Sequence, residues 1–158
     1  MHLGGPLAYF ITFHTYGTWL HASDKGSVDQ ERNQFGAPLI PPNAEFERRR
    51  RESMRQAEMV FGDDERTAMD ATIREVCTHR GWRIHTINVR TNHVHVVVAG
   101  SDTPEKMLGD FKRYGTRRLR KNGLVAQDRL VWAEHGSTRY LWDDKDVYEA
   151  CNYVANCQ

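Results

Sequence analysis

The sequence predicts an α+β domain in which antiparallel strands form a sheet and helices pack against it. Segments rich in β-branched and aromatic residues alternate with helical segments in the order β, insertion, α, β, β, α, β, α. Two neighbouring strand segments are separated by only two residues, which indicates a hairpin. The length of 158 residues fits a single domain spanning 1–158.

The first half of the chain contains a strand, an insertion and a helix. Residues 6–20, PLAYFITFHTYGTWL, are rich in β-branched and aromatic residues and predict the first strand. The insertion, at about 21–60, begins irregular with scattered glycine and proline and becomes charged and helical from Glu45 onward. Residues 63–81 predict an amphipathic helix, with acidic residues in its first turn and Gly81 as its stop.

The second half continues with a hairpin and a second helix. Residues 82–90, WRIHTINVR, alternate so that Ile84 and Ile87 fall on opposite faces, and residues 93–100 form the next strand. Residues 103–123 predict a helix with a proline in its first turn and a glycine at its end.

The last part of the chain is expected to hold one more strand region and a final helix. Residues 129–144 predict either a short strand pair or a strand and a loop. Residues 144–157 predict a helix capped by an aspartate near its start.

The composition argues against a membrane protein, a secreted protein and a disulfide-stabilised protein. The formal net charge is +1, and no stretch approaches the roughly 18 apolar residues of a membrane span. The N-terminus lacks the basic region followed by a long apolar stretch that marks a signal peptide. Three cysteines without a Cys-x-x-Cys pair argue against a disulfide framework or a zinc ribbon. We therefore expect a cytoplasmic protein.

Charge is unevenly placed along the chain. Basic residues cluster in 47–56 and 111–121, and acidic residues cluster in 61–66 and 142–146. Local basic patches can bind a polyanion even when the net charge is small. The second basic cluster predicts a basic helix face, which serves either as a solvated surface or as a contact for DNA phosphates. Its members are Lys112, Arg113, Arg117, Arg118, Arg120 and Lys121.

Two histidines stand one residue apart in the segment RTNHVHVVVAG. Because side chains at i and i+2 of a strand share a face, His93 and His95 present two imidazoles side by side. The alternate residues, Val94, Val96 and Val98, would point into the core. Paired neutral imidazoles can hold a divalent metal and leave positions open for substrate. Taken alone, the pair is more simply two polar residues on a solvent face.

The wider context of this pair resembles a known family. The segment NHVHVVV is similar to the HUH motif of single-tyrosine HUH enzymes, above all IS200-like and REP-associated tyrosine transposases, although Thr91 stands where a proline is usual. These families continue with a helix, a tryptophan-containing segment and a tyrosine-bearing last helix. The chain shows MLGDFKRYGTRRLRK, VWAEHGSTRYLW and DVYEACNYVANC in that order. The resemblance covers residues 6–158 apart from the insertion.

The resemblance implies a ferredoxin-like HUH domain that nicks and joins single-stranded DNA through a 5′-phosphotyrosine. The similarity of ACNYVANCQ to the family's last helix maps the nucleophile onto Tyr153. Hairpin-forming DNA, as in repeated palindromic elements, is the expected substrate. We favour a monomer, as in REP-associated relatives, with a dimer as the alternative.

The same resemblance implies a metal site that holds Mg²⁺ or Mn²⁺. His93 and His95 would supply two ligands, and the family takes a third from about one turn past the tyrosine. An amide oxygen suits these ions better than a thiolate does. We therefore favour Gln158, with Asn156 and then Cys157 as alternatives.

Other aromatic and histidine residues compete for roles. Tyr114, in the basic helix, is the main alternative nucleophile, although packing or stacking suits it better. Tyr148 is expected to face the core. The two tryptophans are expected in the core rather than as base-stacking platforms. Among the unpaired histidines, expected to be structural, His14 is the one to examine near the HUH pair. The remaining members of these groups are Trp132, Trp142, His21, His85 and His135.

Two rival functions remain open. One is a transposase relic that binds nucleic acid without chemistry. The other is a metal hydrolase of small phosphoesters, which needs more carboxylate ligands than the sequence places near His93 and His95.

Overall fold

The computed structural model describes residues 4–18 and 54–156. The order of its elements confirms the predicted succession of strands and helices. They are β1 (Ala8–His14), α2 (Asp63–Arg80), β2 (Arg83–Val89), β3 (His93–Ala99), α3 (Pro104–Lys121), β4 (Ser137–Leu141) and α4 (Asp144–Asn156). None of the helices in the described part of the chain is both long and apolar enough to cross a membrane.

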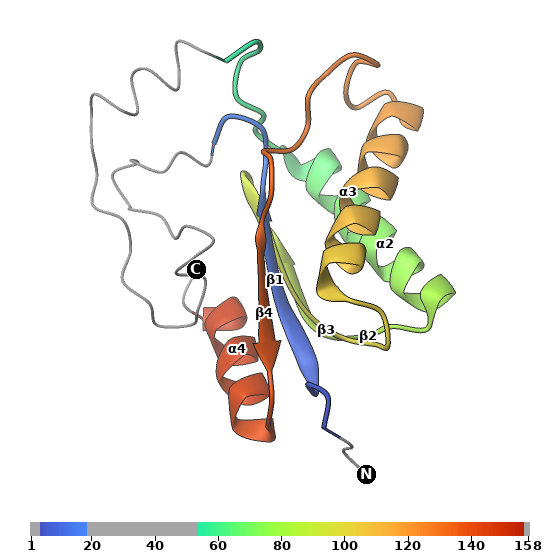
Figure 1. Cartoon of the computed structure of the whole chain (residues 1–158). Coiled ribbons are helices and arrows are strands. Elements are labelled where there is room, and N and C mark those ends of the chain that lie inside the picture. The colour runs from blue at the N-terminus through green and yellow to red at the C-terminus, as the bar shows by residue number, and fades with distance from the viewer. Residues whose placement is uncertain (1–3, 19–53, 157–158) are drawn as a thin grey trace, which may run out of the picture.

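The four strands form one antiparallel sheet in the order β2-β3-β1-β4. Each helix that joins two parallel strands skips over the strand between them, which is the split β-α-β arrangement of ferredoxin-like folds. Helices α2 and α3 cover one face of the sheet, and α4 covers the other (Figure 1). The predicted α+β, ferredoxin-like architecture is therefore confirmed.

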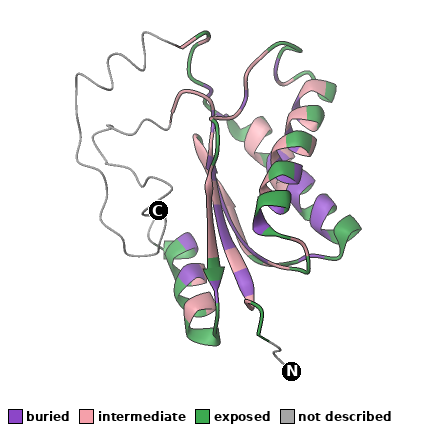
Figure 2. Ribbon diagram, in the orientation of Figure 1, coloured by how far each residue is buried: buried purple, intermediate pink, exposed green. Residues whose placement is uncertain are grey.

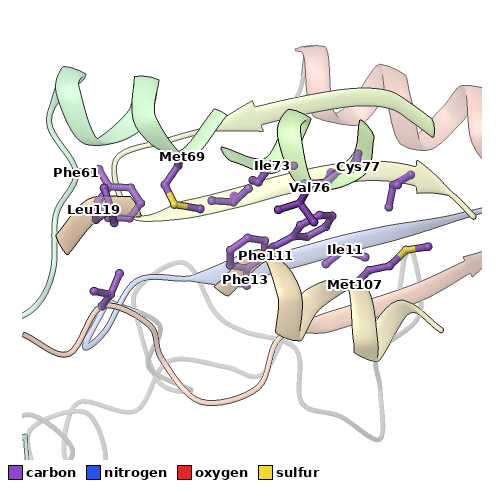
Figure 3. Packing of buried hydrophobic residues seen from close by; sticks show 14 of the residues in the cluster. Ile11, Phe13, Phe61, Met69, Ile73, Val76, Cys77, Met107, Phe111 and Leu119 are labelled. Carbon is purple, nitrogen blue, oxygen red and sulfur yellow. The ribbon is translucent and has the colours of Figure 1, made fainter. Parts of the chain in front are cut away.

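The main hydrophobic core lies between the sheet and helices α2 and α3 (Figure 3). Alternate side chains of β1 and β3 enter it, which confirms that the valines at 94, 96 and 98 point away from the histidine face. Its fully buried members include Ile11, Phe13, Phe61, Met69, Ile73, Val94, Val96, Val98, Met107, Phe111 and Leu119.

A smaller core lies on the other face, beneath α4. It is built from short side chains, with Phe10 as its one ring, and the outer side of α4 stays exposed (Figure 2). Its buried members are Ala8, Phe10, Val97, Leu141, Ala150 and Val154. Since α4 contributes only alanine and valine to the buried set, the helix can lie close to the sheet.

Strand β2 contains a bulge that the alternation of its sequence does not predict. The pairing with β3 shifts between Ile84 and Thr86, so that His85 is the extra residue. Strict alternation would place Ile84 and Ile87 on opposite faces. The bulge instead turns both toward the main core, so the predicted face assignment of this strand is wrong.

The helix boundaries follow local signals. Gly81 ends α2 in the left-handed conformation with φ 78°, and its N–H reaches the last turn. The Thr103 side chain accepts from Lys106 N and caps α3. Asp143 Oδ1 accepts from Asp146 N at 2.9 Å, so the predicted aspartate cap of the last helix is confirmed.

Residues 54–62 form neither helix nor strand, so the expected helical character of the insertion is wrong for this part. Tertiary contacts decide the conformation. Met59 N donates to Tyr16 O at 2.8 Å, and Phe61 N donates to Thr91 O at 2.7 Å. The side chains of Met59 and Phe61 are buried in the main core. The remainder of the insertion, 19–53, lies outside the described residues.

Between α3 and α4, the described chain forms one strand and a loop rather than a strand pair. Before β4, the loop contacts the residue that follows β1 through an isolated bridge between Trp132 and Thr15. Trp132 packs edge-on against Phe13 and Phe61, with ring centroids 5.0 and 5.5 Å apart. Its predicted place in the core is confirmed.

Candidate active site

The histidine pair lies on the face of the sheet that α4 covers. His93 and His95 on β3 pair with His14 and Thr12 on β1, and partners in antiparallel strands point to the same side. The ring centroids of His93 and His95 are 4.7 Å apart. The predicted side-by-side arrangement of the two imidazoles is therefore present.

His95 is enclosed rather than solvated. Its side chain is 7% exposed, and its ring lies 5.5 Å from that of Phe10. A hydrogen bond of 2.8 Å joins His95 Nδ1 to Thr12 Oγ1. Burial, followed by the charge of neighbouring His93, lowers the pKa of His95 to about 3. The imidazole is neutral at pH 7, which is the form that binds a metal. The interpretation of the pair as a solvent face is wrong for His95.

The imidazole of His93 is oriented by the residue before it. His93 Nδ1 donates to Asn92 Oδ1 at 2.7 Å, because an amide oxygen can only accept. With the proton on Nδ1, the other ring nitrogen of the neutral imidazole carries a lone pair. Hydrogen bonds of this kind fix the tautomer of metal-binding histidines. The hydrogen bonds from Asn92 and Thr12 thus orient both rings through their Nδ1 atoms.

Tyr153 comes from α4 and lies beside this pair. Ala150 and Val154 pack against the sheet and fix the orientation of the helix. Tyr153, the residue before Val154, lies near β1 and β3. Its ring centroid is 5.9 Å from that of His95 and 5.9 Å from that of Phe10. The side chain is 36% exposed, so a substrate in solution can approach it. The expected proximity of this tyrosine to the HUH strand is present.

His14 adds a third imidazole that the sequence only marked for inspection. Its ring centroid lies 5.5 Å from that of His93 across the β1–β3 pair. Burial, followed by the charges of His93 and Lys112, lowers the pKa of His14 to about 3. Only the pairing of β1 with β3 brings His14 beside His93, which is 79 positions away in the sequence. Neither segment alone indicates this contact.

Arg139 is a cation on this face that sequence reasoning missed. It lies opposite Phe10 in the β4–β1 pair, on the side covered by α4. Burial lowers the pKa of its guanidinium to about 10, against the opposing effect of Asp146 on α4. The group is still charged at pH 7, so a positive charge stands on the same face as Tyr153.

The residues expected to supply a third metal ligand lie at or beyond the end of the described chain. Gln158 and Cys157 lie outside the described residues. Asn156 is exposed, and its Nδ2 donates to Asn152 Oδ1 at 2.7 Å. No cluster of three or more His, Cys, Asp or Glu side chains suited to a metal occurs in residues 4–18 and 54–156. The two imidazoles, oriented by Thr12 and Asn92, would fit a divalent cation that takes its other ligands from oxygen donors.

The rival aromatic residues lie elsewhere. Tyr114 is on α3, on the opposite side of the sheet from the histidine pair. Tyr148 is 72% exposed, so its expected place in the core is wrong. The buried positions of α4 follow 147, 150 and 154, and residue 148 is turned away from them. Trp142 is 50% exposed beside Tyr140, which also contradicts a core position.

At least four of the six basic residues of α3 have a partner within the protein, and Lys112 and Arg118 contact other elements. Lys112 Nζ donates to Ala133 O at 3.0 Å and to His135 O at 2.6 Å, which fixes the loop before β4. Arg118 forms an ion pair of 2.6 Å with Glu75 on α2. The other four, with Lys112, line an open groove on α3, and they are Arg113, Arg117, Arg120 and Lys121.

Comparisons with known proteins agree with this architecture. The family model for IS200-like transposases matches residues 53–153. A solved REP-associated tyrosine transposase, bound to a REP hairpin, is similar with a TM-score of 0.55 and 13% identity, covering 98% of this chain and 67% of that one. A candidate transposase from Deinococcus radiodurans R1 is similar with a TM-score of 0.56 and 12% identity, covering 99% and 94%. No curated protein matches the chain.

Proposed function

This chain belongs to the IS200-like transposase family, and from that premise we propose that it nicks and rejoins single-stranded DNA with Tyr153 as the nucleophile. The observation that carries the proposal is the placement of the Tyr153 ring 5.9 Å from that of His95. A partly exposed phenol, the imidazole pair and a charged guanidinium share one face of the sheet. That combination suits attack on a phosphodiester.

The proposed reaction conserves the energy of the bond that is broken. The Tyr153 oxygen attacks the scissile phosphorus, its proton is lost, and a 5′-phosphotyrosine forms while the 3′ oxygen leaves and takes up a proton. The reverse attack by a 3′-hydroxyl restores the phosphodiester without ATP. Because an ordinary tyrosine has a pKa of about 10, the phenol needs an electrophilic, charge-neutralised phosphate. Arg139 is placed to contribute positive charge to it.

We propose Mg²⁺ or Mn²⁺ as the cofactor, with His93 and His95 as two of its ligands. When bound, the cation polarises the phosphate and neutralises developing charge. For the third ligand the proposal remains Gln158, with Asn156 and Cys157 as alternatives. Thr12 and Asn92 hold the two imidazoles in place through their Nδ1 atoms.

We propose hairpin-forming single-stranded DNA as the substrate and a monomer as the acting unit. The similar REP-associated transposase is bound to a REP hairpin, which supports a DNA partner of this kind. The basic surface of α3 would bind the DNA backbone, because phosphate contacts from lysine and arginine supply most non-specific affinity. The proposed set is Lys112, Arg113, Arg117, Arg118, Arg120 and Lys121.

A covalent-adduct assay tests the proposed function. The unmodified protein is incubated with hairpin DNA and Mn²⁺, and a denaturing gel shows whether a protein–DNA band forms. Tyr153→Phe should bind DNA but form neither adduct nor nick. Tyr148→Phe, an exposed tyrosine of the same helix, is the matched control and should keep the adduct. An adduct in Tyr153→Phe that disappears in Tyr114→Phe would overturn the assignment. No adduct with any hairpin would favour the non-catalytic relic.

A further inference from the structure

Helix α4 rests on the sheet through an apolar layer of short side chains. In the described part of the chain, this layer takes its sheet residues from β1, β3 and β4, and α4 adds Ala150 and Val154 with their partly buried neighbours. Because the hydrophobic effect has no direction, such a layer fixes the distance of the helix from the sheet better than its rotation. A helix that holds a nucleophile in one place therefore needs a directional contact as well.

Asn88 on β2 makes a directional contact with α4. Its Nδ2 donates to Val154 O at 3.3 Å, and this hydrogen bond joins residues 66 positions apart. Since a backbone carbonyl only accepts, the amide nitrogen must be the atom that faces it. Val154 lies in the last turn of α4, where carbonyl groups have no amide partner within Asp144–Asn156. Asn88 therefore binds a group that the helix itself does not pair, and this group belongs to the residue after Tyr153.

The same residue lies directly beside His95. In the pairing of β2 with β3, Asn88 is the partner of His95, and in the pairing of β3 with β1, His95 is the partner of Thr12. Partners across antiparallel strands point to one side of the sheet, with Cβ atoms about 4.5–5.5 Å apart. The three side chains thus form a row across β2, β3 and β1. Within this row Thr12 orients His95, and Asn88 holds the helix that carries the tyrosine.

The bulge in β2 is what turns Asn88 toward α4. Ile84 packs on the main core, and strict alternation would send residues 86 and 88 to that same face. The extra residue, His85, reverses the alternation, so that Ile87 packs on the main core and Asn88 comes to the α4 face. Bulges re-aim side chains and are frequent beside active sites. The irregularity of β2 therefore places an amide donor under the last turn of α4.

We infer that Asn88 is a positioning residue, which fixes the last turn of α4 and thereby sets the place of Tyr153 beside His95. The inference rests on the proposed function and adds to it the part that aligns the nucleophile. Asn88 needs no contact with DNA or with a metal for this role. A shift of about 1 Å in a reacting group can lower a rate by roughly 100-fold. A hydrogen bond between neutral groups can therefore matter more for the chemistry than for folding.

The rate of adduct formation tests this role. Asn88→Leu keeps the approximate size of the side chain but removes the donor. Asn152→Leu is the matched control, because Asn152 is exposed on α4 beside Tyr153 and its side chain pairs with Asn156 of the same helix. In single-turnover reactions with a hairpin oligonucleotide and Mn²⁺, Asn88→Leu should form the adduct at least about tenfold more slowly. The DNA concentration that gives the half-maximal rate should stay unchanged. Asn152→Leu should match the unmodified protein.

Three kinetic outcomes would overturn the inference. An unmodified rate in Asn88→Leu would show that the contact with α4 does not align the tyrosine. A higher half-maximal DNA concentration would make Asn88 a DNA contact instead. Full recovery of the rate at raised Mn²⁺ would make it part of a metal site. Asn88→Asp, which has the same shape but a carboxylate that cannot donate at pH 7, should be as slow as Asn88→Leu.

Amide hydrogen exchange without DNA or metal keeps the test independent of catalysis. Asn88→Leu should speed exchange in the last turn of α4 at least about threefold, while α2 and α3 exchange as in the unmodified protein. Unchanged exchange in that turn, or an equal rise in α2 and α3, would overturn the inference. If the unmodified protein forms no adduct with any hairpin but exchange in that turn still rises, the proposed function fails. The assignment of Asn88 as the residue that fixes α4 then stands.

Discussion

The two faces of the sheet are built from the same strands but serve different ends. Toward α2 and α3, every second residue is a large apolar side chain, and aromatic rings such as Phe13 and Phe111 stack in the interior. Toward α4, the same strands present His93, His95 and Thr12, with a thin apolar layer beneath them. Strand alternation therefore lets one seven-residue strand contribute both to the main core and to the face that carries the histidine pair.

The largest expected effect comes from the face toward α2 and α3. Phe111→Ala removes a fully buried ring that contacts Phe13 and Trp82. The free energy of unfolding should fall by about 3–5 kcal/mol, measured by urea denaturation. DNA cleavage should be lost together with folding. A drop below about 1 kcal/mol would mean that this face is not the main source of stability.

A substitution on the histidine face should change both DNA cleavage and the free energy of unfolding, because His95 is buried. His95→Ala should abolish the covalent adduct. It should also lower the free energy of unfolding by about 1–3 kcal/mol, because the buried His95 side chain is removed and the partly buried Thr12 Oγ1 loses its partner. His93→Ala, at a less buried position, should destabilise less. Cleavage by His95→Ala at the normal rate with added Mn²⁺ would exclude a metal site here.

A change at Asp110, on α3, tests the layer opposite the histidine face without removing an aromatic ring. The side chain is 2% exposed and is shared by Arg80, Lys106 and Arg113. Asp110→Asn should cost about 1–3 kcal/mol in thermal or urea unfolding, because the cations lose a buried acceptor charge. The folded variant should still form the covalent adduct between Tyr153 and a short hairpin that contains the cut bond. If the folded variant forms no adduct, Asp110 affects the chemistry on the opposite face of the sheet.

The cysteines give the smallest effect. Burial raises the pKa of Cys77, on α2, to about 12, so its thiol stays protonated and unreactive at neutral pH. Cys151, on α4, is only partly buried. Peptide mapping after brief alkylation at pH 8 should show Cys151 modified before Cys77. The reverse order would mean that α2 opens more readily than α4.

The same shift predicts a pH effect on stability. The pKa of Cys77 is higher in the folded than in the unfolded state, where it is 9.0. The folded state favours the neutral thiol, so this contribution to stability is present below pH 9. It decreases between pH 9 and about pH 12. Cys77→Ala should show a weaker loss of stability over that interval, measured by urea denaturation.

Periodicity and end signals predicted the helices and the order of the strands. The alternation in β3 also separated the histidines from the valines, and the resemblance placed Tyr153 on the last helix. These features depend on neighbours within a few residues. The positions of the site residues could be compared with the structure, whereas their catalytic and metal-binding roles stay predictions.

The features that the sequence did not predict depend on distant parts of the chain. The bulge at His85 is one extra residue whose effect appears only when β2 pairs with β3. Residues 54–62 are not helical despite a helical composition, because Met59 N and Phe61 N donate to distant backbone groups. The approach of His14 to His93 likewise depends on register. Long-range pairing overrides local propensity in all three cases.

The backbone hydrogen bond from Met59 to Tyr16 has a consequence for how this fold can vary in evolution. This bond joins the chain just before the insertion to the chain near its end. Phe61, which follows, is buried in the main core. For a flexible loop, each doubling of length adds only about 0.6 kcal/mol to the cost of closure. A longer or exchanged segment at this junction should therefore leave the sheet and its histidine-bearing face unchanged.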